Sequence, residues 1–389
     1  MRFGYFHNPH DITKQRDYGE LLEELRELAV LCDRTGFDTF WLPEHHFSVW
    51  GRELLPNPLL MAADLAARTE RIRIGLGAAI ITFWHPLRAA EDIALLDHLT
   101  GGRLEVGVGR GNYGLEARNL NPIADPNDPP MNVKVFDEAV SVLKAALGQE
   151  RFSFKGDIYQ YPAPGFRADR AHSVDDPAYV DPETKELVKL SIFPRPRQKP
   201  LPPMWQMVNS LDSIRAAARQ DMGIVMWRPP VESIRLRLST YREAVQQATG
   251  AELPIGARTA IMRDTFVAAS EEEAFRIAGG PLMDALNFSN WRGPSIYLEP
   301  DETLPSEQKA ALKRHLSYEF VRDRSVYFGP PEHIIGKVEQ LWRATRIEGV
   351  VFKCSWPGLP HAHCRESVRR LGEEVLPALA QLDLAEAAE

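Results

Sequence analysis

An acidic residue and two histidines stand side by side near the start of the chain, where an apolar stretch gives way to a loop. Residues 38–43 have the apolar and aromatic character of a buried strand, and Glu44, His45 and His46 follow directly. Two imidazoles beside a carboxylate could transfer protons, form half of a metal site or simply pack, because histidine titrates closest to neutrality. Strand alternation places Glu44 and His46 on one face and His45 on the other, so at most one histidine points inward.

A glycine-rich motif is the second candidate. Residues 109–114 read G-x-G-x-x-G directly after a predicted strand. A dinucleotide-binding turn needs a helix to begin within the glycines, but residues 119–130 are rich in Asn, Asp and Pro and predict turns. We interpret the glycines as opening access to Arg110, whose guanidinium offers a fork of donors suited to phosphate or carboxylate. A salt bridge at the rim of the fold is the alternative interpretation.

A further place for an anion is the junction between a predicted strand, 204–208, and the predicted helix that follows it. Asn209, Ser210 and Ser213 lie at this junction. Amide groups without helical partners and the helix dipole favour a phosphate there, and serine hydroxyls add donors. Ordinary N-capping is the alternative, since serine is also a preferred cap. Together with Arg110, the junction favours a cofactor that carries a phosphate.

A group of residues near the end of the chain has the side chains of a zinc site. These residues are Cys354, His361, His363 and Cys364. The spacing of the two cysteines matches no common zinc pattern, and the prolines between them indicate an ordinary loop. We therefore expect no metal site.

The elements that must position these residues alternate between strand and helix. The predicted strands are 2–6, 38–43, 72–81, 104–108, 204–208, 224–227, 257–267 and 350–353. The predicted helices are 21–35, 57–68, 86–99, 133–147, 213–220 and 231–249, with others beginning at 271, 306 and 365. About eight strand–helix units with buried strands predict the α/β class and a closed (β/α)8 TIM barrel with long loop insertions. An open doubly wound sheet is the competitor, and both folds carry the active site at the carboxyl ends of the strands.

We expect one barrel domain over residues 1–389, with two stretches that interrupt the alternation. Residues 160–203 are rich in Pro, Asp and Arg, and residues 281–305 place aromatic side chains among Gly, Pro and Ser. Loops this long inside a compact domain are usually lids, binding loops or disordered segments. We predict both stretches to be insertion or lid loops.

The bulk composition excludes several classes of function. Hydrophobic residues make up 44% of the chain and charged residues 26%, which suits a large folded core. The formal net charge of −8, without a basic cluster, argues against nucleic-acid binding. There is no apolar run of about 18 residues and no secretory signal, and the odd number of cysteines fits a reducing compartment. We expect a cytoplasmic protein with no membrane or nucleic-acid partner.

A series of short motifs follows one order along the chain. They are Gly36-Phe37-Asp38-Thr39, Trp41-Leu42-Pro43-Glu44-His45-His46-Phe47, Asn57-Pro58, Gly77-Ala78-Ala79, His85-Pro86-Leu87-Arg88-Ala89-Ala90-Glu91-Asp92, Leu95-Leu96-Asp97, Gly102-Arg103 and Gly109-Arg110-Gly111. This order resembles the bacterial luciferase-like flavin monooxygenases, and the luciferase alpha chain in particular. The similarity is dense over the first part of the chain and weaker, but in register, beyond it.

The resemblance implies a (β/α)8 barrel that binds reduced FMN and reacts it with O2 to give a flavin C4a-hydroperoxide. His45 matches the family's catalytic histidine, which assists proton transfer. Arg110, Ser210 and Ser213 match phosphate ligands, and Lys134 does so more weakly; Ala78 and Ala79 match an alanine pair joined by a non-proline cis peptide. The full set implied to bind the cofactor is Glu44, Ala78, Ala79, Arg110, Lys134, Asn209, Ser210, Ser213 and Trp227.

The implied activity is that of a two-component, FMNH2-dependent monooxygenase acting on a small or medium organic substrate. A separate NAD(P)H-dependent flavin reductase would supply FMNH2, and a homodimer would form through helices near residues 58–68 and 86–99. We expect the substrate pocket to be lined by Trp84, Tyr113, Trp205, Met207, Phe288 and Trp291. The alternatives are an F420-dependent oxidoreductase on the same barrel and a non-catalytic flavin-binding protein. Asn209 and Gly109 replace a glutamate and a reactive cysteine of luciferase, which argues against light emission and a fatty-aldehyde substrate.

Overall fold

Parallel strands close into a barrel in the computed structural model, which describes residues 1–167 and 176–386. In order around the barrel they are β1 (Arg2–Phe6), β2 (Thr39–Leu42), β3 (Arg73–Leu76), β5 (Leu104–Gly109), β8 (Met204–Met207), β9 (Gly223–Trp227), β10 (Thr259–Val267) and β12 (Gly349–Lys353). The sheet closes because β12 pairs with β1 on one side and with β10 on the other. The short strands β4 (Ala79–Ile80) and β11 (Val326–Gly329) pair with β5 and β10. The predicted (β/α)8 barrel is confirmed.

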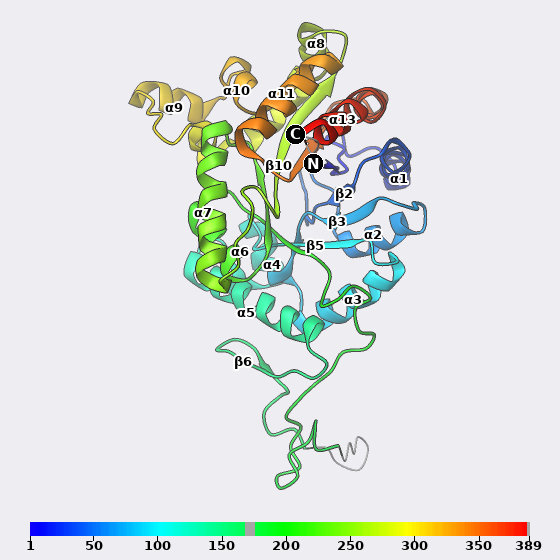
Figure 1. The fold of residues 1–389 in the computed structure, drawn as a ribbon, viewed down its shortest axis with the longest axis vertical. Coiled ribbons are helices and arrows are strands. Elements are labelled where there is room, and N and C mark those ends of the chain that lie inside the picture. The colour runs from blue at the N-terminus through cyan, green and yellow to red at the C-terminus, as the bar shows by residue number, and fades with distance from the viewer. Residues whose placement is uncertain (168–175, 387–389) are drawn as a thin grey trace.

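Helices surround the strands, as Figure 1 shows for α1, α2, α3, α5 and α7. The helices that connect barrel strands include α1 (Tyr18–Thr35), α2 (Pro58–Ala66), α3 (Pro86–Leu99), α5 (Pro129–Gly148), α6 (Leu211–Arg219), α7 (Val231–Thr249) and α11 (Pro331–Thr345). The others are α4 (Gly114–Leu120), α8 (Glu271–Phe288), α9 (Ser306–Arg314), α10 (Tyr318–Ser325), α12 (His361–Arg370) and α13 (Leu376–Glu386), with a π-helical turn at Leu371–Val375 and 3-10 turns at Ile81–Phe83, Pro122–Ala124, Asn290–Arg292 and Pro294–Tyr297.

Local sequence signals explain where such helices begin and end. The side chain of Asp17 caps α1 by accepting the amide hydrogen of Gly19 at 2.7 Å, and Gly36 ends the helix in the left-handed region at φ 93°. Between them Leu21, Leu25 and Leu28 are buried at helical spacing, so α1 presents one apolar face to the barrel.

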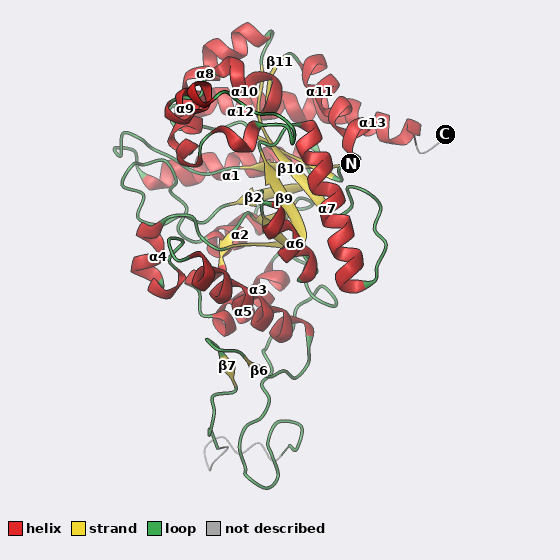
Figure 2. Ribbon diagram, turned by 90° about the vertical axis from the view of Figure 1, so that its left-hand side faces the viewer, coloured by secondary structure: helices red, strands yellow, loops and turns green. Residues whose placement is uncertain are grey.

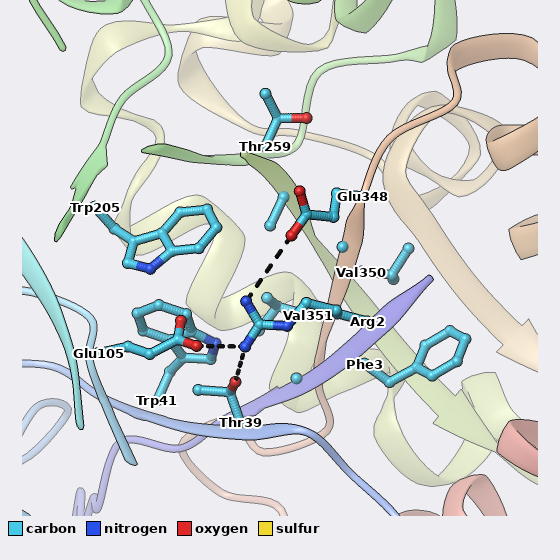
Figure 3. Close-up of a pocket in the computed structure, with 13 residues that line it drawn as sticks. Arg2, Phe3, Thr39, Trp41, Glu105, Trp205, Thr259, Glu348, Val350 and Val351 are labelled. Atoms are coloured by element: carbon cyan, nitrogen blue, oxygen red, sulfur yellow. Dashed lines mark hydrogen bonds and ion pairs between the residues drawn. The ribbon is translucent and has the colours of Figure 1, made fainter. Parts of the chain in front are cut away.

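The barrel interior is filled by side chains and glycines that alternate along the strands. Trp41, Trp205, Val225, Ala260 and Val351 form an interior cluster, and the rings of the two tryptophans meet edge-on with centroids 6.0 Å apart. The first residues of several strands close the amino end around a small cavity (Figure 3). The barrel is therefore a packed core, and its chemistry has to lie at one of its mouths.

The sequence patterns predicted too few strands and helices in the last third of the barrel. We predicted no strand at β11 and no helices at α10 or α11; in the two helices the apolar residues are interrupted by charged ones, and β11 is only four residues long. We also expected turns after the glycine-rich motif, but α4 begins at Gly114, its last glycine. The local argument against a dinucleotide-binding turn was wrong, although the barrel itself excludes a Rossmann sheet.

The predicted loop at 281–305 is also wrong over its first part. Residues 281–288 are the second half of α8, and Pro281 lies inside that helix. Four side chains at four-residue spacing are buried along α8: Ala274, Ala278, Leu282 and Leu286. Their packing outweighs the local cost of a proline, which sequence reasoning took as the end of the helix.

The described parts of the insertion at 160–203 extend away from the barrel, beyond α5, in both views (Figures 1 and 2). Just before it, Glu138 of α5 accepts three backbone amide hydrogens from residues 157–159. At its far end Arg195 donates to the carbonyl oxygens of Ala146 and Leu147 at 2.6 and 2.8 Å. Part of the predicted insertion, 168–175, lies outside the described residues. A lid role for the segment stays a prediction.

The described residues contain neither a helix suited to a membrane nor a cluster of metal ligands. None of their helices has both the length and the apolar character needed to cross a membrane. Within the same ranges no three His, Cys, Asp or Glu side chains are grouped in a way that could hold a metal ion. His361 instead pairs with Glu27 at 2.7 Å, and Cys354 and Cys364 are buried thiols.

Candidate active site

The carboxyl ends of the strands bring together the residues that the sequence singled out. His45 follows β2, Arg110 follows β5, and Ser210 follows β8. Because the strands are parallel, these chain segments share one rim of the barrel. In the strand order β5 lies beside β8 and only β3 separates it from β2. The predicted acid–base group and the predicted anion ligands therefore surround one mouth.

His45 is held between two carboxylates. Its Nδ1 donates to Glu116 Oε1 at 3.3 Å, and its Nε2 lies 3.5 Å from Glu53 Oε1. Tyr113 packs against the imidazole, with 5.6 Å between ring centroids, and its hydroxyl donates to the same Glu53 oxygen at 3.5 Å. Burial lowers the pKa of His45, but the hydrogen bond to Glu116 and the charges of the nearby carboxylates outweigh it, so this pKa is raised. The imidazole is thus stabilised in its protonated, proton-donating form.

Glu44 supports the opposite side of the same loop. Its buried carboxylate accepts from the backbone amide of Ile80 at 2.8 Å, from His46 Nε2 at 2.9 Å and from Trp84 Nε1 at 3.0 Å. His46 donates its own backbone amide to Glu116 at 2.7 Å, which ties the two sides together. Glu44 and His46 therefore position the loop that carries His45. Direct contact of Glu44 with a cofactor, and of Trp84 with a substrate, stays a prediction.

The non-proline cis peptide exists, but one bond earlier than we predicted. It joins Gly77 to Ala78, whereas Ala78 and Ala79 are linked in the usual way. A sequence match identifies neighbouring residues more easily than the bond between them, which explains the error. The side chain of Met207 lies against this segment, since a Cβ added to Gly77 would be 3.4 Å from its Cε. Met207 therefore packs against the segment that carries the cis bond, and contact of Ala78 and Ala79 with a flavin stays a prediction.

Two groups of donors fit a phosphate on one side of this mouth. The backbone of Arg110 is fixed by Thr82 and Asn132, which donate to its carbonyl oxygen at 3.1 and 3.0 Å. On the neighbouring strand, Ser210 caps α6 by accepting the amide hydrogen of Ser213 at 3.3 Å and donates its hydroxyl hydrogen to Ser213 Oγ at 2.9 Å. The capping interpretation is therefore confirmed for Ser210. A guanidinium, two hydroxyls and the first turn of a helix also form a donor set that suits a phosphate.

Asn209 and Trp227 link this side to the next strand. The backbone amide of Trp227, the last residue of β9, donates to Asn209 Oδ1 at 3.2 Å. By strand alternation Trp227 points inward with Val225, which belongs to the interior cluster. Lys134 is placed less favourably, because its exposed side chain pairs with Asp157 on the outer face of α5. Its role as a phosphate ligand stays a prediction.

Two predicted pocket residues lie elsewhere. Trp205 lines the cavity at the amino end of the barrel (Figure 3), so its assignment to the pocket at the carboxyl ends was wrong. The sequence indicated its strand but not which end of the strand it occupies. Trp291 is 55% exposed, which contradicts a place inside a dry pocket. Phe288 packs against Trp50 and lies under Arg52, 4.7 Å from the guanidinium, and so supports the loop that carries Glu53.

Sequence reasoning missed four charged residues of this mouth. Glu53 and Glu116 contact His45, while Arg228 and Lys353 follow or end barrel strands. The available signal for the last two was their position, since a charged residue at the carboxyl end of a predicted barrel strand indicates a site. Nothing in the local sequence paired Glu53 or Glu116 with the histidine.

A parallel barrel with a histidine–carboxylate group and anion donors at its carboxyl mouth defines a (β/α)8-barrel enzyme. The family described as "Luciferase-like monooxygenase" matches residues 1–348. The chain therefore belongs to the luciferase-like monooxygenase family.

Similar proteins agree with this membership. The chain is 24% identical over 387 residues to the oxygenase component of the flavin-dependent trigonelline monooxygenase of Acinetobacter baylyi, covering 98% of this chain and 96% of that protein. It is 38% identical over 118 residues to the alkanal monooxygenase alpha chain of the Kryptophanaron alfredi symbiont, covering 30% and 32% of the two chains. The oxygenating constituent of 3,6-diketocamphane monooxygenase from Pseudomonas putida, solved with FMN, has a TM-score of 0.74 at 21% identity, covering 97% and 98% of the two chains.

The fold is shared by enzymes with another cofactor. An F420-dependent secondary alcohol dehydrogenase has a TM-score of 0.65 at 16% identity, covering 97% of this chain and 98% of that one. The fold alone therefore does not choose between the two cofactors, and the residues of the mouth must decide.

Proposed function

We propose that the protein is the oxygenase component of a two-component monooxygenase that uses FMNH2 and O2. When bound, FMNH2 supplies two electrons, so that one atom of O2 enters an organic substrate and the other leaves as water. A separate NAD(P)H-dependent flavin reductase would regenerate FMNH2. The Acinetobacter relative, which is named as an oxygenase component, supports this division of labour.

The observation that carries the proposal is the position of His45 between two carboxylates at the mouth of the barrel. Glu116 occupies its Nδ1 and Glu53 lies near its Nε2, and together they favour the imidazolium. A proton held at Nε2 is available to a reacting oxygen at the mouth of the barrel, which is the task of a general acid. The Tyr113 ring packs against the imidazole, with 5.6 Å between the ring centroids.

Rapid mixing tests the function. The anaerobic protein with FMNH2 is mixed with O2, and the absorbance spectrum is followed. We expect a transient species distinct from both reduced and oxidised FMN, which lasts longer than in a solution of FMNH2 alone. The same experiment with reduced F420 is expected to give no reaction with O2 that depends on the protein. Tight binding of F420 with no stabilised transient from FMNH2 would favour the F420-dependent alternative instead.

We also propose a homodimer formed through α2 and α3. These two helices pack against each other, and Leu60, Leu95 and Leu99 leave large apolar side chains exposed on them, with Leu60 72% exposed. Exposed apolar patches of this kind mark association surfaces. Sedimentation of the wild-type protein and of Leu60→Glu tests the proposal: we expect a dimer that the substitution weakens, and a monomeric wild type would contradict it.

A further inference from the structure

Lys353 ends the last barrel strand and points into the mouth. Val351 belongs to the interior cluster, and alternation places Lys353 on the same inner face of β12. Its Nζ lies 5.9 Å from the centre of the Phe6 ring. Within the part of the chain that the structure describes, no carboxylate oxygen comes within 4.0 Å of this ammonium, although Asp264 is its partner in the register of β10 and β12. Lys353 is an inward-facing cation without an ion pair.

Arg228 is the second cation at this mouth. It follows Trp227 directly and has a left-handed backbone, φ 78°, which is strained for a bulky side chain and often marks a functional position. Its Nη2 donates to the hydroxyl of Ser289 at 2.6 Å, and its guanidinium lies 5.8 Å from the ring centre of buried Tyr297. These partners are neutral. Among the described residues, Arg228 has no carboxylate at ion-pair distance.

Lys353 and Arg228 stand at the same rim of the barrel, at the carboxyl ends of β12 and β9, which only β10 separates. Burial lowers the pKa of Lys353, and the positive charge of Arg228 lowers it further, while Asp264 and Glu53 act in the opposite direction. The same Glu53 lies beside His45, so the cations and the acid–base group share one electrostatic environment. Holding two like charges near each other in a partly buried site is unfavourable unless an anion joins them.

Lys353 does not stand on the phosphate side of the mouth. In the strand order, β12 lies four strands from β5 in either direction, so Lys353 and Arg110 stand on opposite sides of the barrel. In the same way β9, which precedes Arg228, lies opposite β2, which precedes His45. Lys353 also lies beyond residues 1–348, the range that the family description matches. Lys353 therefore stands opposite Arg110 across the mouth, while Arg228 stands opposite His45 and one strand from Ser210.

We propose that Lys353 and Arg228 bind a carboxylate group of the organic substrate. A carboxylate accepts hydrogen bonds from an ammonium and from a guanidinium at once, and it would relieve the repulsion between the two cations. The substrate of this chain is accordingly an organic acid, held with its acidic group opposite the phosphate side and its reactive part near His45. That the bound acid is the substrate rests on the proposed function, whereas the binding of the acid at this site does not.

Calorimetric titration of the purified protein with matched acids and amides tests the proposal. The three pairs are nicotinate and nicotinamide, trigonelline and 1-methylnicotinamide, and cyclohexanecarboxylate and its carboxamide. We expect at least one acid to bind about tenfold or more tightly than its amide, because hydrogen bonds to charged groups are the stronger ones. Lys353→Met and Arg228→Met should each lower the ratio of acid affinity to amide affinity about tenfold, without changing the affinity for the amide. If no acid binds more tightly than its amide, the proposal is wrong.

A control separates a local effect from a change in overall charge. Lys309→Met removes one exposed positive charge from α9 and should keep the acid preference. Thermal unfolding of each variant shows whether it is folded. Should Lys353→Met not fold, Arg228→Met provides the same test. If a folded Lys353→Met or Arg228→Met variant keeps the full preference, the carboxylate does not bind there.

FMN titrations show which proposal fails. We expect Lys353→Met to keep the wild-type affinity for FMN. An equal loss of FMN affinity would show that Lys353 serves the cofactor phosphate, which contradicts the inference. A wild-type protein that binds no flavin but still prefers acids would contradict the proposed function and leave the carboxylate site intact.

Discussion

The two ends of the barrel treat their charged residues differently. At the amino end, Arg2 donates to Glu105 and, at 3.2 Å, to Thr39 (Figure 3). Arg73 donates to the same Glu105 at 2.7 Å. At the carboxyl end, Lys353 and Arg228 have no carboxylate within ion-pair distance among the described residues. Charges that satisfy one another stabilise a fold, whereas charges left for a ligand serve a site. The contrast assigns stability to one end and binding to the other.

Removing the imidazole at the carboxyl end should have the largest effect. In His45→Ala we expect the yield of oxygenated product per FMNH2 to fall about 100-fold or more, since general acid catalysis contributes that much. The free energy of unfolding and the affinity for FMNH2 should change little. Product analysis against FMNH2 oxidation measures the yield. His361→Ala, which alters a histidine–glutamate pair outside the mouth, is the control; an unchanged yield in His45→Ala would contradict the assignment.

Breaking the ion pairs of Glu105 at the amino end should lower the stability of the fold and leave FMN binding unchanged. Glu105 is buried, while its arginine partners are about a third exposed at most. Glu105→Ala should lower the free energy of unfolding by about 3 kcal/mol, at the low end for a broken buried ion pair because the arginines keep some water. Urea unfolding measures this loss, and FMN affinity of the folded protein should stay the same. The exposed pair of Arg343 and Glu339 provides the control, since Glu339→Ala should cost less than about 1 kcal/mol.

The carboxylate beside His45 should control the dependence of activity on pH. Glu116 raises the pKa of His45, so this histidine stabilises the fold below its unfolded pKa, and the stabilisation is lost as pH rises through the higher folded pKa. In Glu116→Gln the pKa falls, so the alkaline limb of the activity profile should move to lower pH and activity at pH 8 should fall severalfold. Activity measured from pH 5 to 9 tests this. A profile that keeps its alkaline limb would show that Glu116 does not act through His45.

The smallest expected effect separates a cap from a phosphate ligand. Ser210→Ala and Ser270→Ala each remove an N-cap, of α6 and α8, and should each cost about 1 kcal/mol of stability. Only Ser210 lies at the phosphate side of the mouth, so only Ser210→Ala should also weaken FMN binding, by a few fold. Equal FMN affinity in the two variants would leave Ser210 as a cap alone.

Much of the fold could be predicted because the spacing of apolar residues within a short segment indicates both the type of element and its buried face. The predicted bounds of α3 and α7, 86–99 and 231–249, agree with the structure. Where packing overrides a local signal the prediction failed, as at Pro281 in α8. The site was predicted to the extent that strand ends define it, which identified His45 and Arg110 as residues of one rim.

The rest depended on contacts between distant parts of the chain. Glu116 stands 71 positions after His45, and only the closed barrel brings the two together. Trp205 shows the converse, because a correct strand assignment did not say which end of the barrel the ring would fill. Lys353 and Arg228 required the strand order before they could be seen as a pair.

A crystal structure of the protein with FMN and a bound organic acid tests the central claim most directly. We predict the phosphate beside Arg110 and the start of α6, and the carboxylate between Lys353 and Arg228 on the opposite side of the mouth, with His45 near the space between them. A phosphate bound by Lys353 and Arg228 would contradict the account.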